Sequence, residues 1–343
     1  MSFENLSERE RNILQALIDY YIATAQPVGS RVLAHKFGLG ISPATIRNTM
    51  QDLEEMGLVK QPHTSAGRVP TDTGYRVYVD ELLEPENLAL SEKKKIEEEI
   101  LVDYSAIEEL LEQAARVLGN VSQELGVILS PRFDKGILTR IDLIPMAERK
   151  ILVVLVVKSG LVKTILLEAE SNLETLALEK TKSILNERLC GLSLKEIMDS
   201  MEQRLKESAG ADAKLIKLFL DSKETLLSFQ ETEQLHLSGT TNIVSQPEFK
   251  DKHTLSSFIA LLEEKKILAQ LIAAKGISEG ITITIGRELT RGEAQSLSLV
   301  TSRYQAGEII GTIGIIGPTR MRYGKLVSLV DYTAKLLSKI LSE

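Results

Sequence analysis

The chain has 343 residues, of which 43% are hydrophobic and 26% charged, and its formal net charge is -7. This length and composition exclude a disordered chain and leave room for two or three domains, each with its own core. The only cysteine is Cys190, which excludes an intrachain disulfide and a zinc site with several thiolates, and agrees with a reducing cytoplasm.

Apolar runs and charge distribution narrow the class of protein further. No apolar run reaches the roughly 18 residues of a membrane span, so the sequence predicts a cytoplasmic protein outside the membrane. The negative net charge argues against a uniformly basic surface for nucleic acid. However, residues 26–78 carry six Arg and Lys against four Asp and Glu, whereas residues 81–112 carry three Lys against eleven acids. The acids are thus concentrated away from a mildly basic N-terminal segment.

Three helices are predicted before residue 57. Ser7 opens the capping box SERE, and apolar residues follow it at spacings of three and four. A second, shorter helix is predicted in PVGSRVLAHKF, before the glycine-rich turn GLGIS. The third helix is expected to have Ser42 as its N-cap and Pro43 at its first position, where the missing N–H costs nothing.

A small hairpin is predicted next. LVKQ and RVP have the pattern of two short strands around a loop, and TDTGYRVYVDELL begins a helix that has Thr71 as its cap and ends before Pro85. Three helices followed by a hairpin indicate a winged helix-turn-helix, which we assign to residues 1–84. Residues 85–125 are helical by pattern and are predicted to connect this head to the rest of the chain.

The remaining sequence predicts an α+β fold. Strand-like segments begin at Val127, helices are expected from about Asn172 to Glu233, and strands return in GITITIG, SLSLVTSRYQ and EIIGTIGIIGP before a last amphipathic helix. Strands on both sides of a helical block indicate one sheet domain with an insertion. The predicted boundaries are 126–190 and 256–343 for the sheet domain and 191–255 for the insertion.

Motifs of the common enzyme classes do not occur in the sequence. The four histidines lie far apart, and there is no GxSxG, GxxxxGK[ST] or GxGxxG motif. GTIGIIG, from Gly311 to Gly317, has glycines three apart among apolar strand residues, which close backbone packing explains. The sequence therefore predicts no enzyme, no metal site and no cofactor.

The third helix has two distinct faces. At about 100° per residue, Ile46, Met50 and Leu53 fall on one side, with Thr49 and Met56 at its edge, and are predicted to pack inward. Arginine can donate two hydrogen bonds to guanine, asparagine or glutamine can pair with adenine, and alanine can touch a thymine methyl group. A solvent-exposed face without a ligand is the alternative, and the adjoining hairpin favours DNA. The predicted groove-facing residues are Ser42, Ala44, Thr45, Arg47, Asn48 and Gln51.

The loop PHTSAGR has the composition of a wing that contacts DNA. Ser65, Ala66 and Gly67 are small enough for close backbone approach, and the loop also carries hydroxyl and imidazole donors. An ordinary glycine-containing turn is the alternative. The substitution Arg68→Ala is expected to weaken binding to all DNA sequences evenly. The predicted contacts of the wing and the helix after it are His63, Thr64, Ser65, Arg68 and Arg76.

Four segments of the chain carry a resemblance to a known family. They are SERERNILQALIDYYIATAQPVGSRVL, SPATIRNTMQDLEEMGLVKQPHTSAGRVPTDTGYRVYVD, LSGTTNIVSQPEF and GTIGIIGPTRMRYGKLVSLVDYTAKLL. They resemble the bacterial heat-inducible transcription repressors of the HrcA family, and the similarity spans essentially the whole chain.

The resemblance implies a winged-helix head, a GAF-like α/β sheet domain and an inserted, mostly helical dimerisation domain. It also implies a homodimer that represses chaperone operons from an inverted-repeat operator in double-stranded DNA, is released on heat shock, and has a GroEL-type chaperonin as a partner that keeps it active. The alternative is a metabolite-sensing winged-helix regulator. No convergent set of polar residues for a small molecule is visible between Val127 and Glu343.

Overall fold

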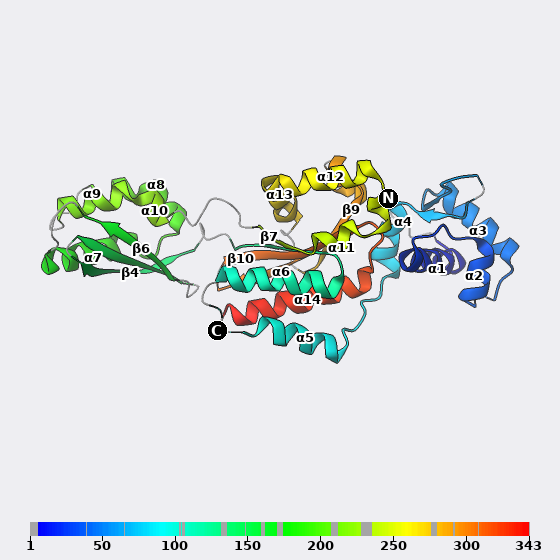
Figure 1. Ribbon diagram of the computed structural model, residues 1–343, viewed down its shortest axis with the longest axis horizontal. Helices are drawn as coiled ribbons and strands as arrows, with labels where there is room; N and C mark the ends of the chain where they lie inside the picture. Colours follow the sequence, from blue (N-terminus) through cyan, green and yellow to red (C-terminus); the bar gives the residue numbers. More distant parts are fainter. Residues whose placement is uncertain are drawn as a thin grey trace. The chain divides into compact units, whose positions relative to one another are not determined.

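A computed structural model gives the fold. It describes residues 6–38, 40–64, 66–102, 104, 107–131, 136–147, 149–158, 162–169, 174–206, 212–227, 235–275, 280–290, 292–307 and 309–342. The chain divides into two compact units, whose elements are labelled in Figure 1. The first unit contains Met1–Leu129, Leu235–Arg303 and Thr312–Ala334, and the second contains Ser130–Gln234, Tyr304–Gly311 and Lys335–Glu343.

The N-terminal head of the first unit is a winged helix-turn-helix, as predicted. Ser7 and Glu10 form the capping box that starts the first helix. The hairpin strands are antiparallel, with Val59 opposite Pro70. The elements are α1 (Glu8–Thr24), α2 (Ser30–Lys36), α3 (Pro43–Glu55), β1 (Val59–Lys60), β2 (Val69–Pro70), α4 (Asp72–Val77) and the π-helix Tyr78–Leu82.

Helix α3 begins and packs as its sequence predicts. The Ser42 hydroxyl accepts a hydrogen bond from the backbone N–H of Thr45 at 3.2 Å, and Pro43 follows the cap. The prediction that Met56 packs inward is wrong: this side chain is 43% exposed, because it lies at the C-cap, just before Gly57 turns the backbone with a φ of 74°. The buried side of the helix consists of Ile46, Thr49, Met50 and Leu53.

The remainder of the first unit is built on a five-stranded sheet of order β7-β3-β10-β9-β8. The second unit interrupts this sheet in sequence, since β3 precedes it and pairs with β10 and β7, which follow it. Strands on both sides of the second unit in the sequence therefore share one sheet. The strands are β3 (Leu125–Leu129), β7 (Leu235–Ser238), β8 (Thr282–Ile285), β9 (Leu297–Ala306) and β10 (Ile309–Pro318).

Helices cover both faces of this sheet (Figure 1). Leu125, Val127 and Leu129 share a core with Phe258 and Ile272 on one face. On the other face the helix before β3 approaches so closely that a Cβ at position 126 would collide with a helix carbonyl. The helices are α5 (Leu90–Ile100), α6 (Ile107–Ser122), α11 (Thr240–Val244), α12 (Lys252–Glu263), α13 (Lys265–Lys275) and α14 (Tyr323–Ile340).

The predicted helical connector, residues 85–125, is therefore part of the sheet domain. The Tyr332 hydroxyl on α14 donates to Glu97 on α5 at 2.6 Å, and Lys325 pairs with Glu92 at 2.7 Å. Helix α6 buries a stripe of leucine, alanine and valine side chains. An amphipathic pattern predicts that a helix has a buried side, but it does not identify the surface that buries it.

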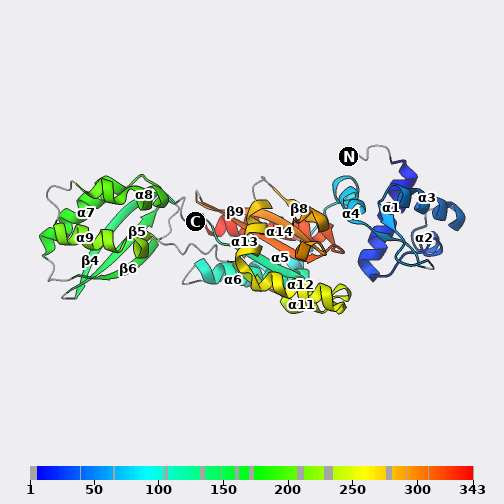
Figure 2. The same ribbon diagram turned by 90° about the horizontal axis from the view of Figure 1, so that it is seen from above.

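The second unit contains its own three-stranded antiparallel sheet of order β4-β5-β6 (Figure 2). One face of that sheet shares a hydrophobic core with the helices that follow it in sequence. The amide side chain of Asn186 also donates to and accepts from the backbone of Ile141 on the edge strand β4. The elements are β4 (Leu138–Ala147), β5 (Lys150–Val157), β6 (Val162–Glu168), α7 (Thr175–Leu189), α8 (Leu194–Leu205), α9 (Ala213–Asp221) and α10 (Lys223–Leu227).

These units correct the boundaries predicted from the sequence. Residues 138–190, which we assigned to the sheet domain, lie in the second unit, and residues 235–255, which we assigned to the insertion, lie in the first. The inserted unit consequently contains the β4-β5-β6 sheet as well as helices. The error arises because alternation identifies a strand but not its partner.

Glu124 immediately precedes β3 and is buried. Among the described residues it is the only Asp, Glu, Lys or Arg in the buried class, with 7% of its surface exposed. The amide nitrogen of Gln246 donates to its carboxylate at 2.8 Å. Burial raises the pKa of Glu124 to about 8, against 4.5 for an ordinary glutamate.

The raised pKa predicts a stability that falls as the pH rises. Above pH 4.5 the Glu124 carboxyl group loses its proton in the unfolded chain, whereas in the folded chain it keeps the proton up to about pH 8. The free energy of unfolding therefore decreases between these two pH values and is constant above them. We expect Glu124→Gln to stabilise the first unit by roughly 2–4 kcal/mol at pH 7. Urea unfolding of both proteins from pH 5 to 8 measures the difference. A difference that does not grow with pH would contradict the assignment.

Candidate nucleic-acid interface

The side of α3 opposite its buried residues is exposed and polar. The Arg47 and Asn48 side chains form no hydrogen bond or ion pair with any described residue, so their donors remain available to base edges. The Gln51 amide donates to Glu55 at 3.2 Å on the surface, a contact that a base can replace. The predicted groove-facing residues that are exposed are Ser42, Ala44, Arg47, Asn48 and Gln51.

The first turn of α3 uses its hydroxyl groups locally. Ser42 Oγ and Thr45 Oγ1 lie 3.0 Å apart, and Ser42 also caps the helix. Ser42 is exposed, whereas Thr45 is half-buried. Both hydroxyls stand at the helix N-terminus, where the partial positive charge of the helix favours an anion such as phosphate.

The loop between β1 and β2 is closed by one glutamine. The Gln61 amide nitrogen donates to the carbonyl oxygens of Thr64 at 3.0 Å and Ala66 at 2.9 Å. His63 and Thr64 are exposed in this loop, as a wing requires. Ser65, the third predicted donor, lies outside the described residues.

Gly67 has an internal role that differs from the predicted approach to DNA. The backbones of Val28 and Arg68 exchange two hydrogen bonds, of 2.8 and 2.9 Å, which tie the wing to the segment before α2. A Cβ at position 67 would collide with the Val28 backbone. The glycine is therefore required where two segments of the head meet.

Arg68, one of the predicted DNA contacts of the wing, forms an ion pair inside the head. Its Nη2 lies 2.7 Å from Glu54 Oε2, and the Arg68 side chain is only 20% exposed. The other oxygen of Glu54 accepts from the backbone N–H of Gln61 at 3.0 Å. The pair thus braces the hairpin against the end of α3, and the DNA contact of Arg68 stays a prediction.

Removing either partner of this ion pair should have the same consequence. We expect Arg68→Ala and Glu54→Ala each to destabilise the head by about 1–2 kcal/mol, since the pair is half-buried, and the double variant to lose little more. Thermal unfolding of the three variants measures this. A DNA contact by Arg68 would instead make Glu54→Ala strengthen DNA binding, because it would release the arginine, and that outcome would support the predicted contact.

Arg76 is also engaged within the protein. It pairs with Asp80 at 3.3 Å and with Glu288 at 3.1 Å, and it donates to the carbonyl of Ile283 on β8 at 3.1 Å. Its neighbour Tyr75 is buried, as expected of a core residue. Arg76 therefore connects the head to the sheet domain, and the structure does not bring it together with the exposed side of α3.

Exposed basic residues that were not assigned as contacts surround α3 in the sequence. Arg31 on α2 and Lys60 on β1 are exposed. Lys36 is exposed as well, and its ammonium lies 5.0 Å from the centre of the Tyr20 ring. Their only signal in the sequence was the positive net charge of residues 26–78. They can supply the sequence-independent attraction to phosphate on which DNA binding depends.

Within the described parts of the chain, no helix is both long enough and apolar enough to cross a membrane.

The three-helix head, its hairpin and the exposed side of α3 define a winged helix-turn-helix DNA-binding protein. Residues 5–82 match the family model for the winged helix-turn-helix transcription repressor HrcA DNA-binding domain, and residues 108–327 match the model for the HrcA protein C-terminal domain. The chain belongs to the HrcA family of heat-inducible transcription repressors.

Similar proteins cover the whole length of the chain. The heat-inducible transcription repressor HrcA of Chlorobium phaeobacteroides (strain BS1) is 39% identical over 100% of both chains. Those of Chlorobaculum tepidum and Geobacter sulfurreducens are 41% and 38% identical and cover 100% and 98% of this chain, at 99% and 98% of their own lengths. A crystal structure at 2.2 Å of a protein described as hypothetical is 24% identical, covers 98% of this chain and 99% of its own, and has a TM-score of 0.62, which supports the fold.

Proposed function

We propose that the chain is a cytoplasmic, homodimeric repressor that binds an inverted-repeat operator in double-stranded DNA. The observation that carries this proposal is the exposed side of α3, where the Arg47 and Asn48 side chains form no hydrogen bond or ion pair with any described residue. An arginine and an asparagine that are consecutive in a helix can read adjacent bases in the major groove. Family membership supports repression as the consequence of binding.

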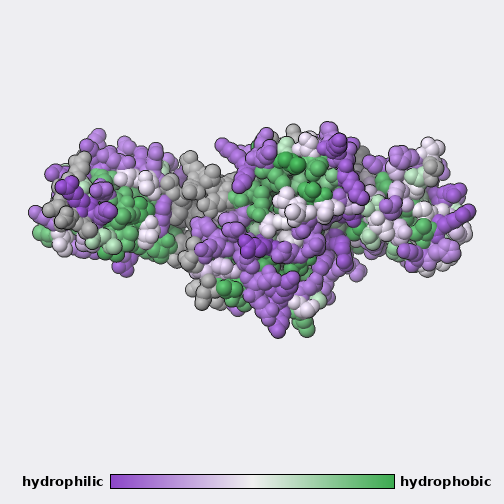
Figure 3. All heavy atoms as spheres, viewed as in Figure 1, coloured by the Kyte–Doolittle hydropathy of each residue, from purple (hydrophilic) through white to green (hydrophobic). Residues whose placement is uncertain are grey.

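The outer face of the β4-β5-β6 sheet supports a dimer. Leu152 on β5 lies between Ile144 and Leu166 on the neighbouring strands, and these two side chains are 44% and 53% exposed. Figure 3 shows hydrophobic residues gathered over the strands of this unit. Contiguous exposed apolar surface marks a contact site, and we assign this face to a second copy of the chain.

A two-fold dimer reads DNA with two identical heads. The operator is then an inverted repeat whose half-sites are separated by multiples of about 10 base pairs, the helical repeat of DNA.

The proposed repressor is regulated by heat. Heating releases it from the operators of chaperone genes. A GroEL-type chaperonin then binds the apolar surface that heat exposes and restores activity. Reactivation after warming should therefore require chaperonin, and full recovery without it would contradict this part.

The five-stranded sheet with helices on both faces supports a GAF-like assignment for the sheet domain. The alternative function, a metabolite-sensing regulator, places the ligand in this domain. A metabolite that raises the thermal midpoint of the purified protein would favour this alternative.

The test of the proposal is a fluorescence anisotropy titration at fixed salt against an inverted-repeat promoter fragment and a scrambled copy, with and without chaperonin. We expect tight binding to the inverted repeat alone, improved by chaperonin. Equally weak binding to both fragments would overturn the operator assignment.

A further inference from the structure

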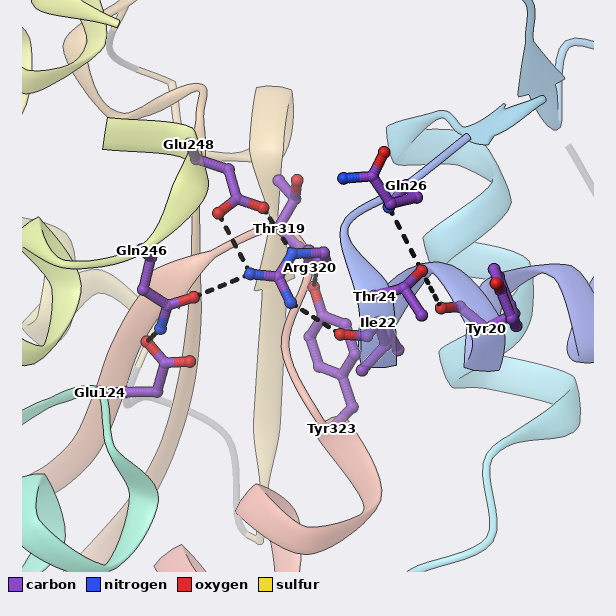
Figure 4. Close-up of polar contacts among 10 residues, drawn as sticks. All are labelled: Tyr20, Ile22, Thr24, Gln26, Glu124, Gln246, Glu248, Thr319, Arg320 and Tyr323. Carbon is purple, nitrogen blue, oxygen red and sulfur yellow. Dashed lines mark hydrogen bonds and ion pairs between the residues drawn. The ribbon is translucent and has the colours of Figure 1, made fainter. Parts of the chain in front are cut away.

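Arg320 joins the DNA-binding head to the sheet domain through one side chain (Figure 4). Its Nη1 donates to the carbonyl oxygen of Ile22 on α1 at 2.7 Å. Its Nε and Nη2 donate to the two oxygens of Glu248 at 2.6 and 3.2 Å, and Nη2 also donates to the side-chain oxygen of Gln246 at 3.0 Å. The arginine side chain is only 12% exposed, so these contacts are shielded from solvent.

At the C-terminal end of α1, Arg320 supplies a hydrogen-bond donor and a positive charge that the helix itself lacks. The backbone N–H of Gln26 would ordinarily bond to the Ile22 carbonyl, but it donates to Thr24 Oγ1 at 3.3 Å instead. The last turn of α1 also contains no basic residue. A helix C-terminus has unpaired carbonyls and partial negative charge, both of which favour a cation. The guanidinium from the sheet domain satisfies both needs.

The sheet domain holds the arginine in place from the other side. Glu248 binds the guanidinium with both oxygens, a geometry that fixes its plane. Gln246 accepts from Arg320 with its oxygen and donates to Glu124 with its nitrogen at 2.8 Å, so its amide has one orientation. The position of Arg320 is thus determined by half-buried Glu248 and Gln246 and, through Gln246, by buried Glu124.

A second attachment lies on α4. Asp72 accepts a hydrogen bond from the backbone N–H of Arg287 at 3.0 Å, and a Cβ at position 286 would collide with the Asp72 carboxylate. Arg76 adds its ion pair with Glu288. Two attachments at separate elements prevent the rotation that a single hinge would allow.

We infer that Arg320 is a positioning residue that sets the orientation of the DNA-binding head on the sheet domain. It touches no DNA in this role. Loss of its contacts leaves each head folded and able to bind a half-site, but leaves its orientation undefined. The role in operator binding rests on the proposed function, whereas the coupling of head and sheet domain does not.

The coupling can be measured without DNA. Spin labels at exposed Asp52→Cys on α3 and Ser256→Cys on α12, in a Cys190→Ser background, report the distance distribution between head and sheet domain. We expect a narrow distance distribution for the labelled protein that retains Arg320 and a broad one for its Arg320→Ala variant. Arg320→Lys keeps the charge but cannot reach all the acceptors, and should be intermediate. Arg116→Ala, which removes a surface ion pair with Glu112, is the control, and its distance distribution should stay narrow.

The functional consequence is measured with the unlabelled full chain. Arg320→Ala should bind an isolated half-site within about twofold of the native affinity and an inverted repeat at least about tenfold more weakly, a loss of about 1.4 kcal/mol. A distance distribution as narrow as the native one, or unchanged inverted-repeat affinity, would overturn the inference. Failure of the native chain to prefer the inverted repeat would refute the proposed function alone, because the spin-label result does not depend on it.

Discussion

Arg47→Ala is expected to weaken operator binding by about 1–3 kcal/mol and to relax the choice of base at one position of each half-site. Arg47 is exposed on α3 and forms no hydrogen bond or ion pair with any described residue, so its removal takes away the proposed base contact without breaking such a bond inside the protein. Anisotropy titrations of native and variant protein against the operator and against copies with single base changes measure both effects.

Arg31→Ala is the matched control, since it removes an exposed arginine from α2 of the same head. If Arg31 contacts phosphate, its loss should weaken binding to all sequences evenly and lower the salt slope by about 1. An Arg47→Ala variant that behaves in this same way, with base choice intact, would show that α3 does not read the groove through this residue.

Leu166→Asp is expected to dissociate the dimer. Leu166 lies on the outer face of the three-stranded sheet, in the same row as Leu152 and Ile144. A carboxylate there would be buried without a partner in the proposed interface, which should raise the dimer dissociation constant at least about 100-fold, or roughly 3 kcal/mol. Sedimentation equilibrium measures the dissociation constant, and the monomer should lose its preference for the inverted repeat over a single half-site.

Leu176→Asp controls for the general effect of a new charge. Leu176 is 65% exposed on α7, in the same unit but on a helix instead of the sheet face. This variant should remain dimeric. If Leu166→Asp remains dimeric as well, the second copy binds elsewhere, and the outer face of the sheet has another function.

The predictions from local sequence were accurate where neighbours in the chain determine the outcome. Ser7, Ser42 and Thr71 cap their helices as expected. A cap needs only residues within one turn, and an apolar pattern needs only the helical period. The same reasoning places Arg47 on an exposed side of the helix from the helical period alone.

Local sequence did not predict contacts whose partners lie far away in the chain. The sequence predicts Arg68 and Arg76 as DNA contacts, and nothing near them in the chain predicts their ion pairs with Glu54 and Glu288. The strand β7, only four residues long, gave too weak a pattern to be separated from the insertion. Arg320 had no local feature that predicted its contact with Ile22, which is 298 residues away.

The sequence by itself determined the winged-helix head, the exposed side of α3 and the membership of a family, because these depend on short-range order and on motifs that are contiguous in the chain. Only the tertiary structure decided which strands share a sheet, where the inserted unit begins, and which arginines are bound internally. Strand pairing and ion pairs are contacts between distant segments, and the free energy that selects among possible partners comes from burial and geometry that exist only in the folded chain.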